Sequence, residues 1–110
     1  MKKINCNNEH VIFLAVNEQK IVGLIHGCVN DLLLMEPYIR IGALVVDEKY
    51  RHQGVGRKLL LATENWAQEQ NINWVGLSSN VDRIESHKFY ENKGYKCLKQ
   101  QKLFKKILKI

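Results

Sequence analysis

A short turn containing two glycines, Arg51-His52-Gln53-Gly54-Val55-Gly56, constrains the fold of this 110-residue chain more than any other segment. The apolar run Leu44–Val46 comes before it and is typical of the end of a buried strand. The residues after it predict an amphipathic helix, because apolar side chains recur there at helical spacing: Val55, Leu59, Ala62 and Trp66. The sequence therefore predicts a strand, a tight turn and a helix in immediate succession.

The same turn is suited to an anion. Glycine lets a backbone approach a ligand closely, and the first turn of a helix leaves amide N–H groups unpaired at the positive end of the helix dipole. Arg51, Arg57 and Lys58 add positive charge. This favours a phosphate-bearing ligand, although the glycines alone are equally consistent with a tight turn and nothing more. A P-loop or dinucleotide motif fits poorly, because no Gly-Lys-Ser/Thr and no third glycine is present.

Two segments together resemble one family. Val45–Gly56 resembles the acetyl-CoA signature of the GNAT N-acetyltransferase superfamily, Gln/Arg-x-x-Gly-x-Gly/Ala, with Arg51, Gly54 and Gly56 at its fixed places. Arg83–Tyr95 resembles the late helix of that family, which ends in Phe-Tyr-Glu-x-x-Gly-Phe/Tyr. The resemblance implies transfer of an acetyl group from acetyl-CoA to the amine of a small molecule or a protein, by direct attack and without a metal.

The predicted architecture is α/β (α+β), a single domain over residues 1–110 with a mixed, mostly antiparallel sheet flanked by helices. The order is β-β-β-α-β-α-β-β. In chain order the predicted elements are strands Val11–Val16, Ile21–Val29 and Tyr38–Val46, helix Gly54–Gln70, strand Trp74–Ser78, helix Arg83–Asn92, and strands Tyr95–Lys99 and Lys102–Ile107.

The predicted order is similar to the GNAT fold without its beginning. The family usually starts with one further strand and two helices, which cover much of the acceptor site, and Met1–His10 is too short to replace them. We expect residues 1–10 to lack regular structure and the exposed sheet edge to be covered by another subunit. The expected assembly is therefore a homodimer or a larger homo-oligomer.

The resemblance also implies which residues bind acetyl-CoA. Backbone amides of the turn would hold the pyrophosphate, amides near Val45 and Val46 would bind the pantetheine arm and the acetyl oxygen, and Asn80 would contact the pantetheine amides. The full predicted set is Val45, Val46, Arg51, His52, Gln53, Gly54, Val55, Gly56, Arg57, Lys58 and Asn80.

Proton transfer is predicted in part. Tyr90 matches the helix tyrosine that protonates the departing thiolate in this family, and a phenol is a sensible donor to a thiolate. Many relatives carry a carboxylate base where this chain has Gly42 and Ala43, neither of which accepts a proton. His26 is a candidate base and Glu36 a weaker one. A water relay, or an amine that arrives neutral, stays open as an alternative.

Composition narrows the other possibilities. Three widely spaced cysteines, with no metal-binding spacing to the four histidines, argue against a disulfide framework or metal site and favour the cytoplasm. No apolar run is long enough to cross a membrane. The net charge of +6 keeps a nucleic-acid-binding protein under consideration, but the lysine-rich tail lacks interleaved aromatics. A coenzyme A-binding module without turnover is the stronger alternative.

Overall fold

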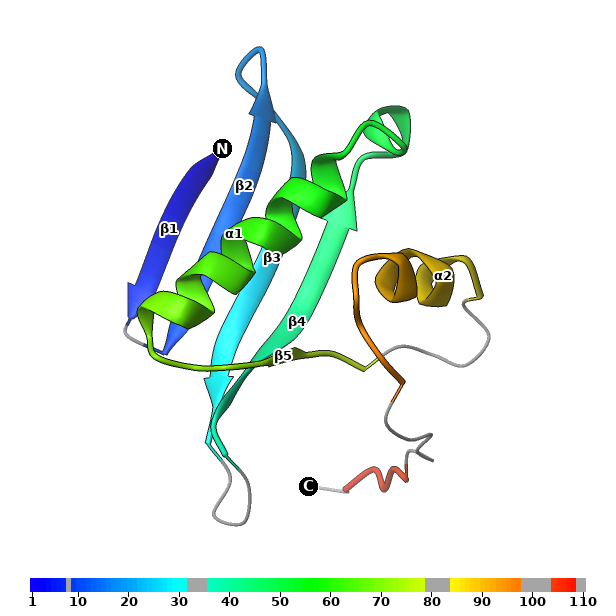
Figure 1. Cartoon of the computed structure of the whole chain (residues 1–110). Coiled ribbons are helices and arrows are strands. Elements are labelled where there is room, and N and C mark those ends of the chain that lie inside the picture. The colour runs from blue at the N-terminus through cyan, green and yellow to red at the C-terminus, as the bar shows by residue number, and fades with distance from the viewer. Residues whose placement is uncertain (8, 32–35, 79–83, 98–103, 109–110) are drawn as a thin grey trace. The chain divides into compact units, whose positions relative to one another are not determined.

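The computed structural model describes residues 1–7, 9–31, 36–78, 84–97 and 104–108 (Figure 1). The chain divides into two compact units, Met1–Ser78 and Ser79–Ile110, and each unit is described by itself. The elements of the first unit are β1 (Lys2–Asn7), β2 (His10–Asn17), β3 (Lys20–Asn30), β4 (Tyr38–Val46), the 3-10 helix η1 (Glu48–Tyr50), α1 (Val55–Glu69) and β5 (Val75–Gly76).

The first unit is built on a five-stranded sheet with the strand order β1-β2-β3-β4-β5. The first four strands pair antiparallel with their sequence neighbours, and β5 pairs parallel with β4. The mixed, mostly antiparallel sheet with helices is therefore confirmed. The β2–β3 hairpin and β4 are also confirmed, and α1 matches the predicted helix once its caps, Gly54 and Gln70, are included.

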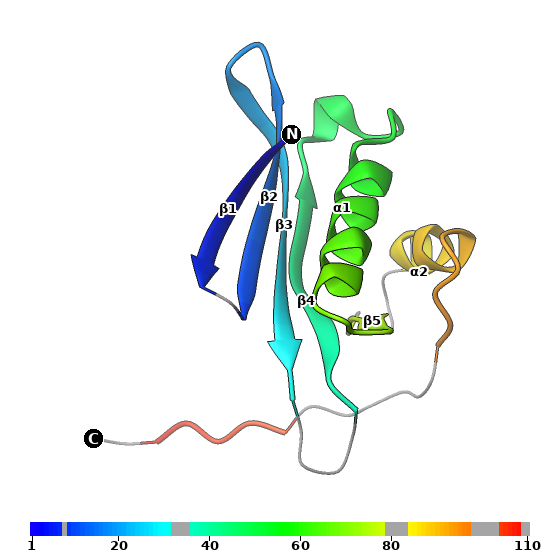
Figure 2. The same ribbon diagram turned by 60° about the vertical axis from the view of Figure 1, so that its left-hand side comes forward.

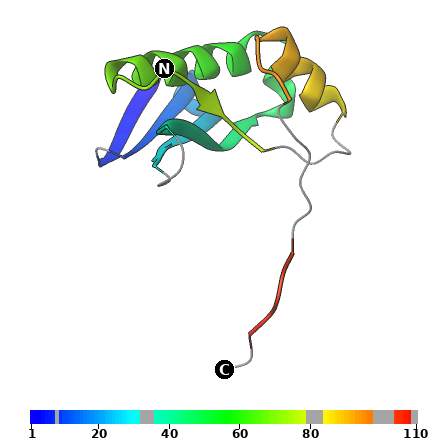
Figure 3. The same cartoon turned by 60° about the horizontal axis from the view of Figure 1, so that its bottom comes forward.

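Helix α1 lies against one face of this sheet, as Figures 2 and 3 show from two directions. Its buried residues recur at helical spacing, as the amphipathic pattern predicts: Leu59, Leu60, Thr63, Trp66 and Ala67. The helix passes close to β3 because Gly27 has no side chain there. A Cβ on Gly27 would lie 3.2 Å from Ile39 and 3.3 Å from Thr63. The core of the unit is therefore the layer between α1 and the sheet.

Trp66 fills this layer and is 3% exposed, in contact with Val11, Ile39 and Ala67. We expect Trp66→Ala to lower the free energy of unfolding by about 3–5 kcal/mol, because a buried aromatic side chain is replaced by a cavity. The loss is measured by urea denaturation. Leu61→Ala is the matched control on the same helix, since Leu61 is 46% exposed. A change of roughly 0.5 kcal/mol is expected there, and equal losses would contradict the packing.

The N-terminal residues differ from the prediction. Residues 1–10 were expected to lack regular structure, but Lys2–Asn7 forms β1 and pairs antiparallel with β2 from Lys2↔Leu14 to Asn7↔His10. Strand formation here depends on the neighbouring β2 edge, which local sequence composition does not reveal. A strand is therefore present where none was expected, and the connection from β1 to β2 is too short to hold a helix.

Strand β5 is shorter than predicted. The sequence predicts Trp74–Ser78, whereas only Val75 and Gly76 pair, with Ile39 and Arg40 of β4. The start of the pairing is fixed by Tyr38, whose ring stacks on Trp74 at 4.0 Å between centroids, and by the Ile39 amide, which donates to the Trp74 carbonyl at 3.1 Å. Beyond Arg40 the two strands diverge and the ladder ends.

The second unit contains α2 (Ile84–Asn92). Its C-terminal end is closed by Gly94 at φ +89°, while the amides of Gly94 and Tyr95 donate to the carbonyls of Glu91 and Tyr90. A glycine in the left-handed conformation is a common end for an α-helix. Asp82, of a residue type that favours the N-cap position, lies outside the described residues.

The two closing strands predicted at Tyr95–Lys99 and Lys102–Ile107 are wrong for the part that the structure describes. Residues 95–97 and 104–108 contain no strand. Alternating apolar and lysine residues fit a strand locally, but a strand also needs a partner to pair with. Phe104, Ile107 and Leu108 are 88%, 78% and 74% exposed, so no described residue packs closely enough against them to fix a ladder. Residues 98–103 lie outside the described chain.

Candidate functional site

Past the short β5 ladder, one edge of β4 is open. Within the described chain no strand pairs with the β5 side of Ile41–Val46. The Asp47 amide donates to the Val22 carbonyl of β3 at 2.7 Å. Successive amides of a strand point to alternate sides, so the amide of Val45 also points toward β3. The amides of Leu44 and Val46 point the other way, toward the open edge. The prediction of Val46 as a donor fits this geometry. The amide of Val45 faces the ladder instead, and its side chain is 56% exposed.

A β-bulge interrupts β4 just before these amides. His26 is opposite Ala43 and Gly27 is opposite Ile41, so Gly42 is an extra residue on β4. A bulge increases the local twist and bends the strand that carries it. The bulge lies two residues before Leu44.

The turn after β4 is held by the 3-10 helix η1. Asp47 caps it, with its carboxylate accepting the Lys49 amide at 2.9 Å. The tip of the β2–β3 hairpin holds the same turn from outside: Asn17 donates to the Tyr50 hydroxyl at 3.3 Å, and Lys20 pairs with Asp47 at 3.7 Å. Sequence reasoning did not single out Asp47 or Tyr50, although an aspartate directly after a strand is a recognisable turn signal.

The glycine turn connects this 3-10 helix to α1. Arg51 Nε donates to the Val46 carbonyl at 3.4 Å, and Gln53 Nε2 donates to the Lys49 carbonyl at 3.2 Å. His52 and Gly54 both adopt positive φ, +64° and +84°. A Cβ on Gly54 would meet nothing within 4 Å, so the space above this residue is open.

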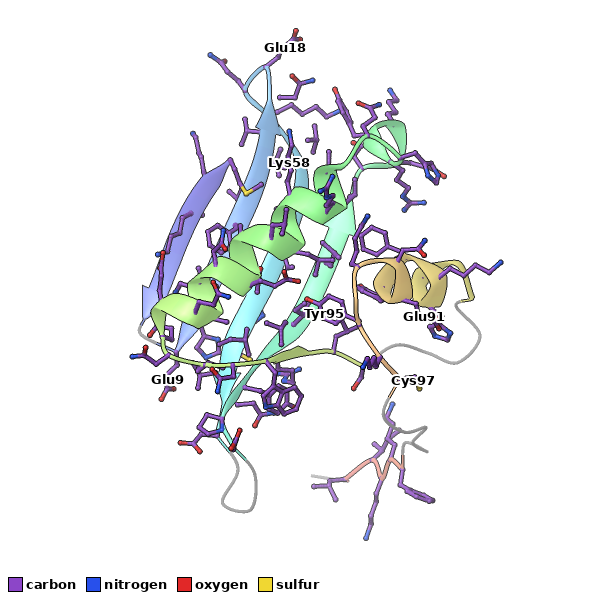
Figure 4. All side chains as sticks on the ribbon, in the orientation of Figure 1. Glu9, Glu18, Lys58, Glu91, Tyr95 and Cys97 are labelled. Carbon is purple, nitrogen blue, oxygen red and sulfur yellow. The ribbon has the colours of Figure 1, made fainter. Side chains whose placement is uncertain are left out.

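Gly54 is the N-cap of α1 and offers no side-chain hydrogen bond to it. The first intrahelical bond runs from the Lys58 amide to the Gly54 carbonyl at 3.1 Å, so the amides of Val55, Gly56 and Arg57 precede the helical ladder. No acidic residue occupies this first turn, whereas Arg57 and Lys58 are exposed there. Figure 4 shows Lys58 at this end of α1. The arrangement is suited to a phosphate group.

His26 lies on β3, next to the bulge. Its ring is stacked on that of His10 at 5.3 Å between centroids, and its Nε2 atom is 3.1 Å from Nδ1 of His10. Burial lowers the pKa of His26 below its usual 6.5, and the nearby His10 and Arg40 lower it further. His26 is therefore held in its neutral form near pH 7, in which an imidazole accepts a proton.

This lowered pKa makes stability depend on pH. The unfolded chain takes up a proton at His26 near pH 6.5, while the folded chain resists it, so the stability contribution is present above that pH and is lost on acidification below it. We expect wild-type protein to lose more stability between pH 7 and pH 5 than His26→Gln, measured as the denaturation midpoint across that range. His52→Gln, at an exposed histidine, is the control and is expected to follow the wild type.

Two other candidates fall elsewhere. Glu36 lies before the N-terminal end of β4, the end opposite the glycine turn, where it lines a cavity of about 490 Å³ together with Glu9, Asp31 and the residues after α1. At about 3.3 Å per residue, the nine residues of β4 separate Glu36 from the open-edge amides by far more than a proton-transfer distance. Asn80 lies outside the described residues.

Tyr90 belongs to α2 in the second unit. Its ring packs edge-on against Phe89 and Tyr95, with centroids 5.3 Å and 5.9 Å away. Figure 4 labels Tyr95 and Glu91 in the same unit. The predicted residues from Val45 to Lys58 therefore all lie in the first unit. The role of Tyr90 as the proton donor stays a prediction.

No group of three or more His, Cys, Asp or Glu side chains among the described residues is arranged to hold a metal ion. No helix in the described ranges has the length and apolar character that crossing a bilayer requires.

The geometry agrees with comparisons to known proteins. Residues 2–95 match the acetyltransferase (GNAT) family. The chain is 27% identical over 85 residues to human N-acetyltransferase 8, covering 76% of this chain and 37% of that protein. It is 33% identical over 84 residues to the aminoalkylphosphonate N-acetyltransferase of Salmonella typhimurium, covering 76% of this chain and 54% of the relative. It thus spans between about a third and a half of these two relatives.

A solved structure has the same fold. An aminoglycoside acetyltransferase from an uncultured soil metagenomic sample, crystallised with trehalose, superposes with a TM-score of 0.83 at 28% sequence identity. The match covers 94% of this chain and 69% of that one. With a family match over most of its length, this chain belongs to the acetyltransferase (GNAT) family.

Proposed function

We propose that this chain is an N-acetyltransferase that moves the acetyl group of acetyl-CoA to an amine by direct attack. The observation that carries the proposal is the continuity of two donor sets on one strand-turn-helix unit. The amides of Leu44 and Val46 face the open edge of β4, and the amides at the start of α1 follow after the glycine turn. A ligand with a diphosphate at one end and a thioester carbonyl at the other matches this order.

The chain's own residues have distinct tasks in this reaction. The N-terminal amides of α1, with Arg57 and Lys58, bind the pyrophosphate. The amides at the open edge of β4 polarise the acetyl carbonyl, and one such donor contributes about 2.7–4 kcal/mol in comparable sites. The incoming amine then displaces the thiolate. By family resemblance, Tyr90 donates the proton that the thiolate takes up.

The acceptor is proposed to be a primary amine of a small molecule, with a protein amine as the other possibility. Relatives named for an aminoalkylphosphonate and an aminoglycoside support the small-molecule class. Both acceptors are polar and carry amines, and in each case the relative is longer than this chain. The acceptor panel should therefore contain both classes and a lysine-bearing peptide.

We also propose a homo-oligomer acting in the cytoplasm. Strand β1 is the last strand on its side of the sheet, and half-exposed apolar side chains such as Ile4 (46%) and Ile21 (55%) favour association. Cys28 is a free cysteine, which suits a reducing compartment. Sedimentation showing a stable monomer at micromolar concentration would contradict the oligomer.

The deciding experiment has two parts. Calorimetry with pure protein measures acetyl-CoA binding, and the amine panel is then screened for release of the coenzyme A thiol. Binding together with thiol release supports the enzyme. Tight binding without release for any amine supports instead a coenzyme A-binding module, which Gly42 and Ala43 favour because neither side chain accepts a proton. Absence of binding would contradict both.

A further inference from the structure

Two histidines form a pair on the sheet face opposite α1. On β3, Gly27 faces α1, because a Cβ there would meet Thr63, so the preceding residue His26 faces the other way. His10 of β2 lies on the same face, one diagonal step from His26, since Ile12 is the direct partner of His26. The Nδ1 atom of His10 and the Nε2 atom of His26 are 3.1 Å apart, and the rings are parallel to within 1°.

The His26 ring extends over β4 at the bulge. A Cβ on Gly42 would lie 2.8 Å from Nδ1 of His26, closer than real Cβ contacts allow. The imidazole therefore occupies the space that a side chain at position 42 would need. Position 42 must be glycine for the ring to lie there, and Nδ1 is placed two residues along the strand from Leu44, whose amide faces the open edge.

We propose that the His10–His26 pair is the proton acceptor of the acetyl transfer and passes the proton on to solvent. This inference rests on the proposed function. His26 Nδ1 takes the proton from the attacking amine, and His10 relays it. His26 fits the acceptor role because its other nitrogen, Nε2, is already bound to His10, while Nδ1 lies beside Gly42 of β4.

The proton balance is simple. Before the reaction, His26 carries its hydrogen on Nε2 and donates it to Nδ1 of His10. When the amine nitrogen bonds to the acetyl carbon and the C–S bond breaks, the amine loses one proton to Nδ1 of His26. The Nε2 proton of His26 moves to Nδ1 of His10, and His10 releases its Nε2 proton to water. The starting state returns when Nδ1 of His26 loses its proton to solvent, the shared proton moves back to Nε2 of His26 and His10 takes a proton from water. The thiolate takes up a separate proton from its own donor.

The charged and titratable groups facing the pair favour release of the proton. Arg40 of β4 and Cys28 of β3 share this face, and His10 itself adds a second imidazole. Burial, His10 and Arg40 all lower the pKa of His26. A proton taken from the amine is therefore passed on and does not stay on the ring.

The test compares His26→Gln and His10→Gln with Cys28→Ser, a control on the same face next to His10. An arylamine of low basicity is the first acceptor, because it stays uncharged throughout the pH range in which His26 titrates, followed by the best amine of the panel. We expect His26→Gln to lower kcat/KM by about 10²–10⁴-fold with acetyl-CoA affinity retained. His10→Gln is expected to move the acidic limb of the pH profile upward, toward 6.5, because one cause of the lowered pKa is removed.

A second readout does not depend on activity. Long-range ¹H–¹⁵N NMR of the ring nitrogens near neutral pH is expected to show Nδ1 of His26 without a proton and Nε2 with one. A proton on Nδ1 would overturn the relay. If the wild type is active and both histidine variants keep its rate and pH profile, the histidine relay is wrong and the proposed function stands. Wild type that binds acetyl-CoA but acetylates neither the arylamine nor any other amine would overturn the proposed function, and the inference with it.

Discussion

Replacing Gly54 with valine is expected to abolish measurable acetyl-CoA binding while the protein stays folded. Gly54 has φ +84° at the N-cap of α1, a conformation that costs a residue with a side chain about 1–2 kcal/mol. The turn would relax away from this geometry and misalign the amides of Val55 and Gly56. Because one hydrogen bond to a charged group contributes roughly 1.5–3 kcal/mol, each lost donor weakens binding by at least about tenfold. Calorimetry measures the change.

Gly94→Val is a matched control for backbone strain. Gly94 has nearly the same φ, +89°, and a Cβ there also meets nothing within 4 Å. It should cost similar stability while acetyl-CoA binding is retained. Gly54→Asn separates strain from space, because asparagine tolerates the left-handed region. If space for the ligand matters, Gly54→Asn will fold normally and bind weakly. Unchanged affinity in Gly54→Val would remove the turn from the binding site.

Tyr90→Phe is expected to lower kcat by about 10²–10⁴-fold, the usual contribution of a general acid, with acetyl-CoA affinity unchanged. The substitution removes only a hydroxyl and keeps the ring that packs against Phe89 and Tyr95. Single-turnover kinetics with the best acceptor measures the chemical step directly. The same experiment with a series of acceptors is the second measurement. If Tyr90 protonates the thiolate, the loss of rate should be the same for every amine.

Tyr95→Phe provides the comparison for the missing hydroxyl. Tyr95 lies directly after the helix stop, with its ring 5.9 Å from that of Tyr90 between centroids. We expect its kcat to remain near that of the wild type. If both variants lose activity equally, the effect comes from the packing of the aromatic rings and the assignment of Tyr90 as the proton donor fails.

Much of the first unit could be predicted because its signals are local. The apolar run that ends Tyr38–Val46, the polar residues at 17–20 and the helical spacing after Gly54 each specify their element without reference to distant residues. The helix stop at Gly94 is local as well. The turn between β4 and α1 was found for the same reason, since its glycines and basic residues are neighbours in sequence.

The features that were missed depend on partners far away in the chain. Strand β1 forms because β2 offers it an edge, and the closing strands predicted in the tail have no such partner in the described residues. The His10–His26 pair needs both the register of the β2–β3 hairpin and the extra residue at Gly42. Neither the hairpin register nor the position of the bulge can be predicted from the sequence. A register shift of one residue would turn every side chain to the opposite face of the sheet.

The tip of the β2–β3 hairpin holds the turn after β4 in place through two side-chain contacts. Asn17 reaches Tyr50, 33 residues further along the chain, and Lys20 reaches Asp47. A surface hairpin thus braces the turn that we propose binds the diphosphate. Substitutions at the tip of the β2–β3 hairpin would therefore change how long acetyl-CoA stays bound at the proposed site, without changing any residue proposed to contact it.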